Sequence, residues 1–395
     1  MTDTNNMSDS LPSPGALAGL RVVDCSRILG GPYCGQILGD HGADVLKIEP
    51  PQGDDTRTWG PPFQHLEGER VAAYFVGINR NKRVMRLDLT TDDGRAVLRA
   101  LLAEADVLLE NFKTGTLDAW GLGPDVIARD FPRLVHCRVS GFGADGPLGG
   151  LPGYDAALQA QCGLMSVNGE RGGEPLRLGI PVVDMVTGLN AAIGVLMALQ
   201  ERGKSGRGQF VESALFDCAL SLLHPHAANF LADGRVPGRS GNAHPNLYPY
   251  DTVPTATAPV FLAVGNDRQF RLLCRHLGAE HLADDARFAN AEGRSVNRAA
   301  LKPELERLMA PHDGAVLADA LVRAGVPCAP VLDVPAALAQ AHTAHRGMVV
   351  ELPGGYRGLG SPIKLSRTPA SYRFTPLTPG EAFLPHGPAA NDEPA

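Results

Sequence analysis

Short apolar runs alternate with helical segments through the first half of the chain. The runs are typical of buried strands and lie at residues 20–26, 43–49, 84–89, 107–110, 134–140 and 209–214. Between them, residues 30–41 and 92–105 have a helical pattern, and Thr91 is a good N-cap for the second of these helices. This alternation predicts an α/β fold with a mostly parallel sheet covered by helices.

The second half of the chain begins with a change of composition. Residues 235–254 are rich in Gly, Pro, Asn and Tyr and follow neither period, which indicates a linker or a site loop. A second set of strands (260–264, 328–332) and helices (268–277, 295–309, 313–324) then predicts a smaller α/β domain. Short strands near 348–352 and 359–365, with no helix of their own, are expected to pack back on the first domain. The predicted parts are a disordered tail (1–16), the first part of the large domain (17–225), a linker and site loop (226–256), the small domain (257–332), the return to the large domain (333–385) and a second disordered tail (386–395).

One carboxylate, Asp184, stands at the start of a long apolar segment. Residues 185–199 are apolar on nearly every face, so this pattern predicts a helix that is buried on all sides. At the N-terminus of such a helix an Asp commonly serves as the N-cap, because its side chain accepts hydrogen bonds from the free N–H groups of the first turn. The same position, partly enclosed, also suits a nucleophile, and the segment alone leaves both roles open.

Composition narrows the classes of function. The 395-residue chain carries a formal charge of −7 and has a pI of about 5.9, so a binding face for nucleic acid or for an anionic membrane is not expected. Its seven cysteines are scattered and form no C-x-x-C pair, which favours a reducing, cytoplasmic compartment over a disulfide framework or a zinc site. The longest apolar stretch, 185–199, is too short to span a membrane, and the first residues are polar and acidic without a signal-peptide core.

Common catalytic motifs are absent or misplaced. Residues 141–146 form a literal G-x-G-x-x-G after a strand, but Pro147 and Pro152 follow, so a helix cannot open there and a dinucleotide site is not expected. There is no G-x-S-x-G elbow and no histidine pair with the H-E-x-x-H spacing, which favours metal-free chemistry. The basic turn 80–83 and Lys113 lie at the ends of predicted strands and are either solvated turns or cations for a phosphorylated ligand.

Several segments together resemble the class III CoA-transferases, the family of formyl-CoA and carnitine CoA-transferases, in which 2-methylacyl-CoA racemase is a sister branch. The resemblance extends from about residue 17 to residue 377, and the order and spacing of its pieces are specific. The matching pieces are 20–24, Gly31-Pro32, 42–49, 81–83, 87–89, 110–112, 141–143, 179–188 and 206–209.

The resemblance implies a doubly wound, Rossmann-like large domain built from both ends of the chain, a smaller α/β domain, and an interlocked homodimer. It also implies that coenzyme A is a co-substrate and that Asp184 is the nucleophile. By matching segment, the family's coenzyme A contacts fall on Leu29, Gly30, Leu87, Asp88, Leu89, Thr90, Asn111, Phe112, Lys113, Gly153, Tyr154 and Asp155.

The family chemistry suits an aspartate. An ionised carboxylate attacks a thioester without a base to activate it, and the resulting anhydride and aspartyl-CoA thioester must be kept from water. The N–H groups of Gly30 and Gly31, or those at the start of the helix of Asp184, are candidate donors to the developing oxyanion.

Three departures from the family pattern refine the expected reaction. Tyr154 stands where the racemases carry a histidine, which disfavours racemisation, although a racemase remains the alternative enzyme. Leu29 stands where formyl-CoA transferase has a glutamine, and Ala119 where relatives often carry an arginine that touches CoA. A transferase acting on dicarboxylic or otherwise polar acids is preferred, because Arg27, Arg177 and His244 are candidates to meet a second carboxylate near the site. A non-catalytic CoA-binding protein is the alternative from another class. The residues expected to meet the acid substrate are Arg27, Arg177, Asn242 and His244.

Overall fold

The computed structural model describes residues 15–384, which form two compact units. Unit 1 comprises residues 15–162, 179–222 and 341–384, and unit 2 comprises residues 163–178 and 223–340. The predicted tails, 1–16 and 386–395, lie almost wholly outside the described residues. Residues 163–178 belong to unit 2, whereas the sequence pattern placed them in the large domain. A hydrogen bond from the Gly241 N–H to the Gly169 carbonyl (3.0 Å) is one of the contacts that join them to it.

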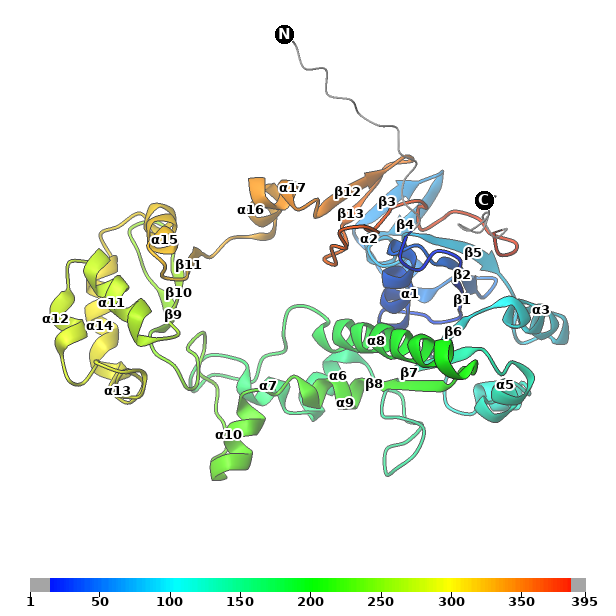
Figure 1. Cartoon of the computed structure of the whole chain (residues 1–395), viewed down its shortest axis with the longest axis horizontal. Coiled ribbons are helices and arrows are strands. Elements are labelled where there is room, and N and C mark those ends of the chain that lie inside the picture. The colour runs from blue at the N-terminus through cyan, green and yellow to red at the C-terminus, as the bar shows by residue number, and fades with distance from the viewer. Residues whose placement is uncertain (1–14, 385–395) are drawn as a thin grey trace, which may run out of the picture. The chain divides into compact units, whose positions relative to one another are not determined.

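Six parallel strands form the main sheet of unit 1, in the order β5-β2-β1-β6-β7-β8 (Figure 1). The bounds of each strand differ by at most a few residues from those of a predicted strand. In register, Val22 of β1 lies opposite Val45 of β2 and Val107 of β6. The strands are β1 (Arg21–Asp24), β2 (Asp44–Glu49), β5 (Lys82–Arg86), β6 (Val107–Glu110), β7 (Val135–Ser140) and β8 (Phe210–Ala214).

Helices cover both faces of this sheet. Val23 and Leu108 point to the face that packs against α3 (Asp92–Glu104) and α5 (Pro124–Asp130). Asp24, the next residue along β1, points to the other face, where α1 (Gly30–Asp40) passes over it. The Thr91 side chain caps α3 by accepting a hydrogen bond from the Gly94 N–H, as predicted. Unit 1 is therefore the doubly wound, Rossmann-like α/β fold that was expected.

The direction of winding reverses between β1 and β6. From β1 the sheet grows outward through β2 and β5, and the chain then returns to place β6 on the other side of β1 and grows through β7 and β8. The loops after β1 and β6 consequently diverge to opposite faces and leave a crevice at their carboxyl ends. In open α/β sheets, ligands bind at such a switch point.

Helix α8 (Val182–Ser205) is longer than the predicted segment, and its burial differs from the prediction. It packs against α1, β7 and β8 along one side, but Ile193 is 49% exposed and Met197 68% exposed. By length and composition alone it is also long and apolar enough to cross a membrane. Near-continuous apolar composition therefore did not mean burial on all sides within one chain. The small residues of α8 are what face α1 and the sheet, among them Gly188, Ala191 and Ala198.

The C-terminal residues of unit 1 return to the edge of its sheet beside β5. The Val84 N–H donates to the Thr378 carbonyl (2.8 Å), and Tyr356 and Leu377 pack with Phe75 in a small hydrophobic cluster. The other elements of unit 1 are η1 (Asp55–Thr58), β3 (Phe63–Leu66), β4 (Glu69–Ala72), α2 (Ala73–Val76), α4 (Thr116–Ala119), α6 (Asp155–Gln161), α9 (Leu215–Ser221), α17 (Ala341–His345), β12 (Val349–Leu352) and β13 (Tyr356–Leu359).

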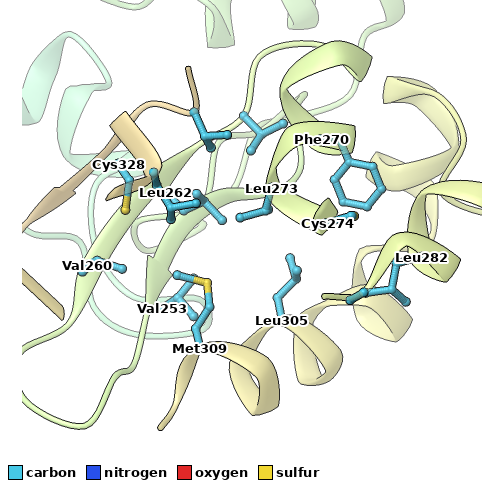
Figure 2. Close-up of a cluster of buried hydrophobic side chains, with 14 of the residues drawn as sticks. Val253, Val260, Leu262, Phe270, Leu273, Cys274, Leu282, Leu305, Met309 and Cys328 are labelled. Carbon is cyan, nitrogen blue, oxygen red and sulfur yellow. The ribbon is translucent and has the colours of Figure 1, made fainter. Parts of the chain in front are cut away.

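Unit 2 is the smaller α/β domain, built on an antiparallel sheet in the order β11-β10-β9. Figure 2 shows its core, in which Leu262 of β10 meets Leu273 and Leu305 from the covering helices. The segment 226–256, predicted as a linker, contributes a helix and a strand to this unit. The elements are α7 (Leu164–Val167), α10 (His226–Asp233), β9 (Tyr250–Val253), β10 (Val260–Ala263), α11 (Asp267–His276), α12 (Glu280–Asp284), α13 (Ala291–Val296), α14 (Arg298–Met309), α15 (Gly314–Arg323), β11 (Cys328–Pro330) and α16 (Val334–Ala339).

Candidate active site

The loops after β1 and β6 are joined at the switch point by a reciprocal pair of hydrogen bonds. The Arg27 N–H donates to Asn111 Oδ1 (2.9 Å), and Asn111 Nδ2 donates to the Arg27 carbonyl (2.7 Å). Here one side chain satisfies both backbone groups of a residue 84 positions away. The two loops are therefore held in a fixed relation, which a binding site formed by both of them requires.

A cavity of about 380 Å³ opens at this junction. The loops after β1, β6 and β7 and the start of α8 contribute to its wall, so residues far apart in sequence meet here. The sequence-predicted site residues in its lining are Arg27, Leu29, Gly30, Asn111, Phe112, Lys113, Gly153, Tyr154 and Asp184. Thr114, Ser140 and Leu215 also line it and were not identified from the sequence.

A second cavity of about 320 Å³ shares Arg27, Phe112 and Lys113 with the first. It lies beyond the carboxyl ends of β2 and β5 and contains the four predicted residues 87–90. Trp120 lies on its wall and offers an aromatic surface that sequence reasoning missed. The two cavities meet at the loop after β6, so an elongated ligand has room along both.

Asp184 lies in the first turn of α8 but is not its N-cap. Pro181 occupies the cap position and provides no side-chain acceptor. Within residues 15–384 the Asp184 carboxylate accepts no hydrogen bond and forms no ion pair, although it lines the cavity. Burial, together with the nearby charge of Asp155, raises its pKa to about 7. The expectation of a fully ionised aspartate at neutral pH is therefore wrong, because desolvation outweighs the helix dipole.

Asp155, predicted to contact coenzyme A, has a different position. It is nearly buried and lines neither cavity. Its Oδ2 accepts hydrogen bonds from the backbone N–H groups of Val183 (2.7 Å) and Asp184 (3.3 Å). These two donors are consequently occupied and cannot hold an oxyanion, which removes the start of α8 from the candidate donors.

Two glycines bring the start of α1 against the first turns of α8. A Cβ on Gly188 would lie 2.5 Å from the Gly30 carbonyl, and a Cβ on Gly30 would lie 3.7 Å from Asp184 Oδ1. Such an approach requires glycine at position 188, because any side chain there would collide with backbone. Gly30, at the N-terminus of α1, therefore lines the same cavity as Asp184, and its N–H has no hydrogen-bond partner among residues 15–384.

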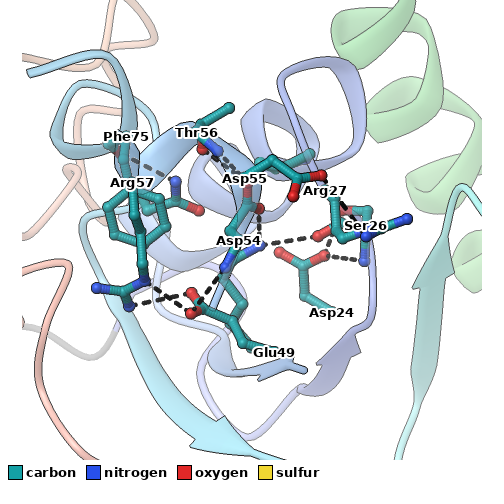
Figure 3. Close-up of polar contacts among 12 residues, drawn as sticks. Asp24, Ser26, Arg27, Glu49, Asp54, Asp55, Thr56, Arg57 and Phe75 are labelled. Carbon is teal, nitrogen blue, oxygen red and sulfur yellow. Dashed lines mark hydrogen bonds and ion pairs between the residues drawn. The ribbon is translucent and has the colours of Figure 1, made fainter. Parts of the chain in front are cut away.

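The loop that carries Arg27 and Leu29 rests on buried ion pairs (Figure 3). Lys47 Nζ donates to the Ser26 carbonyl (2.8 Å) and pairs with Asp54 (3.0 Å), and both side chains are fully buried. Asp24 accepts from the N–H and the hydroxyl of Ser26. Removal of either partner of a buried ion pair is strongly destabilising, because the remaining charge would be desolvated and unpaired. These ion pairs therefore fix the position of the loop above them.

The basic turn 80–83 belongs to this layer rather than to the ligand site. Lys82 pairs with Asp24 (2.8 Å), Arg80 with Asp40 (2.6 Å), and each cation is buried. Both sequence alternatives, a solvated turn and a phosphate site, are therefore wrong for these residues. Residues 80–83 precede β5 or form its first residues, so they lie at the amino end of this strand, whereas the cavities open at the carboxyl ends of the strands. Burial lowers the pKa of Lys82 to about 8 despite the charge of Asp24.

Glu110, at the end of β6, fixes the other loop. Its Oε1 accepts from Arg138 Nε (2.6 Å) and lies 3.2 Å from His136 Nε2, and its Oε2 accepts from the Phe112 N–H (2.8 Å). All three partners are at least partly buried. The direction of the loop 111–113 is thus set by a charged residue that does not itself enter the cavity.

The other predicted substrate residues, Arg177, Asn242 and His244, belong to unit 2. Asn242 lines a cavity within that unit and donates to Thr252 Oγ1 (3.2 Å). His244 Nδ1 accepts from the backbone of residues 246 and 247, and burial, His226 and Arg298 lower the pKa of its ring. Among residues 15–384, no group of His, Cys, Asp or Glu is arranged to hold a metal ion.

Comparison with known proteins agrees with the resemblance seen in the sequence. Residues 17–381 match the model of CoA-transferase family III. The succinate–glutarate CoA-transferase of Agrobacterium fabrum is 39% identical, in a match that covers 90% of this chain and 91% of the relative. The succinyl-CoA:mesaconate CoA-transferase of Haloarcula hispanica is 37% identical, with coverage of 90% and 91%. The crystal structure of a CAIB/BAIF family protein from Brucella suis superimposes with a TM-score of 0.81 at 43% identity and covers 92% of this chain and 96% of that one. A match over nearly the whole chain, on a fold with an aspartate at its switch-point cavity, means that this protein belongs to CoA-transferase family III.

Proposed function

We propose that this protein transfers CoA from an acyl-CoA to a free dicarboxylic acid, with succinyl-CoA as a donor and Asp184 as the nucleophile. The observation that carries the proposal is the free carboxylate of Asp184 in the switch-point cavity. Both relatives described above are named for dicarboxylate substrates, which supports this substrate class.

The second cavity suits the nucleotide end of coenzyme A. It adjoins the cavity of Asp184 along Phe112 and Lys113, and Trp120 provides a flat apolar wall for a base. Lys113 and Arg27 border both cavities and are the cations best placed for phosphate groups, although Arg27 also lies 3.6 Å from Asp55. In this arrangement the thioester end reaches Asp184.

The reaction proceeds by attack of an Asp184 oxygen on the thioester carbonyl. The C–S bond breaks, the CoA thiolate leaves, and an acyl-aspartyl anhydride remains. The thiolate then attacks the aspartyl carbonyl, which releases the donor acid and leaves an aspartyl-CoA thioester. The acceptor carboxylate attacks this thioester and forms a second anhydride, and the thiolate takes the new acyl group and restores Asp184. No proton is gained or lost over the cycle.

The free N–H of Gly30 is the proposed donor to the oxyanion in each of these steps. Gly30 lines the cavity at the N-terminus of α1, whereas the N–H groups of Val183 and Asp184 in α8 are bonded to Asp155. One such donor is worth roughly 3 kcal/mol in the transition state. Because the pKa of Asp184 is about 7, the ionised nucleophile becomes the major form only above neutral pH. We therefore expect transferase activity to rise through pH 7.

We also propose that two copies associate as a homodimer in the cytoplasm. On α8, the apolar side chains of Ile193 and Met197 are exposed, and on α10 Leu231 is 82% exposed. Apolar groups on these helices are of the kind that a partner subunit covers. Light scattering after size exclusion measures the mass directly, and a monomer at micromolar concentration contradicts this part of the proposal.

The decisive experiment combines turnover with trapping. The purified protein is given succinyl-CoA and a panel of dicarboxylic and monocarboxylic acids, and new acyl-CoA is measured by mass spectrometry. In parallel, hydroxylamine or borohydride is added after succinyl-CoA, and the modified residue is located in a digest. We expect exchange with dicarboxylates and modification at Asp184, and neither in D184A. Thermal stabilisation by CoA without exchange to any acid would contradict the transferase proposal and identify a binding protein.

A further inference from the structure

Helix α8 lacks a cap of its own at the end that carries the nucleophile. Pro181 precedes the helix and has no side-chain oxygen to accept from the first-turn N–H groups. A helix end without partners would leave buried donors unsatisfied at a cost of roughly 1–3 kcal/mol each. The acceptor for these N–H groups is the side chain of Asp155, which is the first residue of another helix, α6.

Asp155 makes a short, well-defined set of contacts. Its Oδ2 accepts from the Val183 N–H at 2.7 Å and the Asp184 N–H at 3.3 Å, and its Oδ1 accepts from Gln159 Nε2 at 2.6 Å. Gln159 is fully buried and its amide also reaches the Ile180 carbonyl at 3.5 Å. The pair thus contacts the first turn of α8 and Ile180, two residues before the helix.

We propose that Asp155 is a positioning residue, whose carboxylate holds the first turn of α8 so that Asp184 faces the thioester. This role rests on the proposed function of Asp184, and it replaces the predicted contact of Asp155 with coenzyme A. The carboxylate of Asp155 bonds to α8, whereas its neighbours Gly153 and Tyr154 line the cavity.

The same carboxylate has an electrostatic consequence for Asp184. No cation among residues 15–384 forms an ion pair with either carboxylate, so no partner offsets the repulsion between their charges. The charge of Asp155 adds to burial in raising the pKa of Asp184. Tyr74 of α2 also faces this pair, and burial together with both carboxylates raises its pKa to about 12, so it stays neutral. α1 presents Tyr33 and no charged side chain to this part of α8.

Two variants separate the two effects of Asp155. D155N keeps an amide oxygen that accepts from α8 but removes the charge, whereas D155A removes both. D125N, a matched change in the exposed first turn of α5 away from both cavities, is the control. The first readout is the pKa of the Asp184 carboxyl from ¹³C NMR of Asp-labelled protein, with D184N used to assign the signal. The measurement needs no turnover, so it is informative even if the transferase proposal fails.

We expect the Asp184 pKa to fall by about one unit in D155N and to stay unchanged in D125N. The acid limb of the kcat/KM profile should move with it. At pH 9, where the charge of Asp184 no longer differs, D155A should have a kcat about tenfold or more below that of D155N, with a similar KM. Equal kcat values for folded D155A and D155N at pH 9 would overturn the positioning role, and an unchanged Asp184 pKa in D155N would contradict the electrostatic effect. If D155A does not fold, D155N decides: because it keeps the acceptor, a kcat at pH 9 more than about tenfold below that of the parent would overturn the positioning role.

Discussion

Replacing Asp184 by asparagine should abolish transfer and make the protein more stable at alkaline pH. The buried carboxyl has its pKa raised from 3.8 to about 7, so the fold holds a proton that the unfolded chain releases. Between pH 4 and pH 7 the native state therefore binds more protons than the unfolded state, and stability decreases as pH rises. Above pH 7 Asp184 is ionised in both the native and the unfolded state, so stability no longer changes with pH. The native state then carries the full free-energy cost of the buried charge.

The magnitude follows from the size of the shift. Three units at about 1.4 kcal/mol per unit give an upper limit of about 4 kcal/mol. Because the carboxylate faces a cavity that admits water, roughly half of this, about 2 kcal/mol, is the expected gain for D184N at pH 8. At pH 5, where native Asp184 is protonated, the gain should be less than half of its value at pH 8.

Urea denaturation at a fixed protein concentration measures this difference at pH 5, 6, 7 and 8. The concentration must be fixed because association of subunits also stabilises the native state. D125N serves as a control for the loss of one exposed charge. A D184N variant that is less stable than the parent at pH 8, or a gap that does not change with pH, would refute the assignment of a raised pKa to a desolvated nucleophile.

Three further predictions concern the packing of the two units. K82M leaves Asp24 buried without its partner and should lower the free energy of unfolding by about 3–5 kcal/mol in urea denaturation. G188A places a Cβ against the backbone of α1 and should reduce kcat, whereas G203A, at a position on the same helix with open space, should keep full activity and equal or higher stability. L305A opens a cavity in the core of unit 2 and should cost about 2–5 kcal/mol in the unfolding of that unit; an unchanged midpoint would contradict its place in the core.

Local pattern was enough to predict the strands of the main sheet, and the resemblance of several segments to known sequences indicated the family. The apolar runs that end at Asp24 and Glu110 are long enough to be seen without knowing what they pair with. Matching segments then placed Asp184 and seven other residues that line its cavity, and several of these lie in loops after strands whose carboxyl ends share one edge.

Pairings between distant residues could not be predicted in this way. The basic turn 80–83 resembled a surface feature, yet Lys82 lies buried against Asp24, a residue 58 positions earlier. The apolar helix α8 looked buried on all sides, yet within residues 15–384 Ile193 and Met197 stay exposed on it, while the side that includes Gly188, Ala191 and Ala198 is covered. Composition reports how much apolar surface a segment has, and only packing decides which part of it is covered.

For Asp184 itself, sequence determined its place as a carboxylate at the beginning of a long apolar helix, and the resemblance indicated its proposed role. The tertiary structure decided that it is the third residue of the helix and that Asp155 of α6 provides the missing cap. It also decided that the Asp184 carboxylate lies in a cavity without a hydrogen-bond or ion-pair partner among residues 15–384. Hydrogen-bond partners and desolvation are properties of the assembled fold, because they depend on groups that the chain brings together from different helices and strands. The ionisation of the proposed nucleophile is therefore set by its surroundings and not by its place in the sequence.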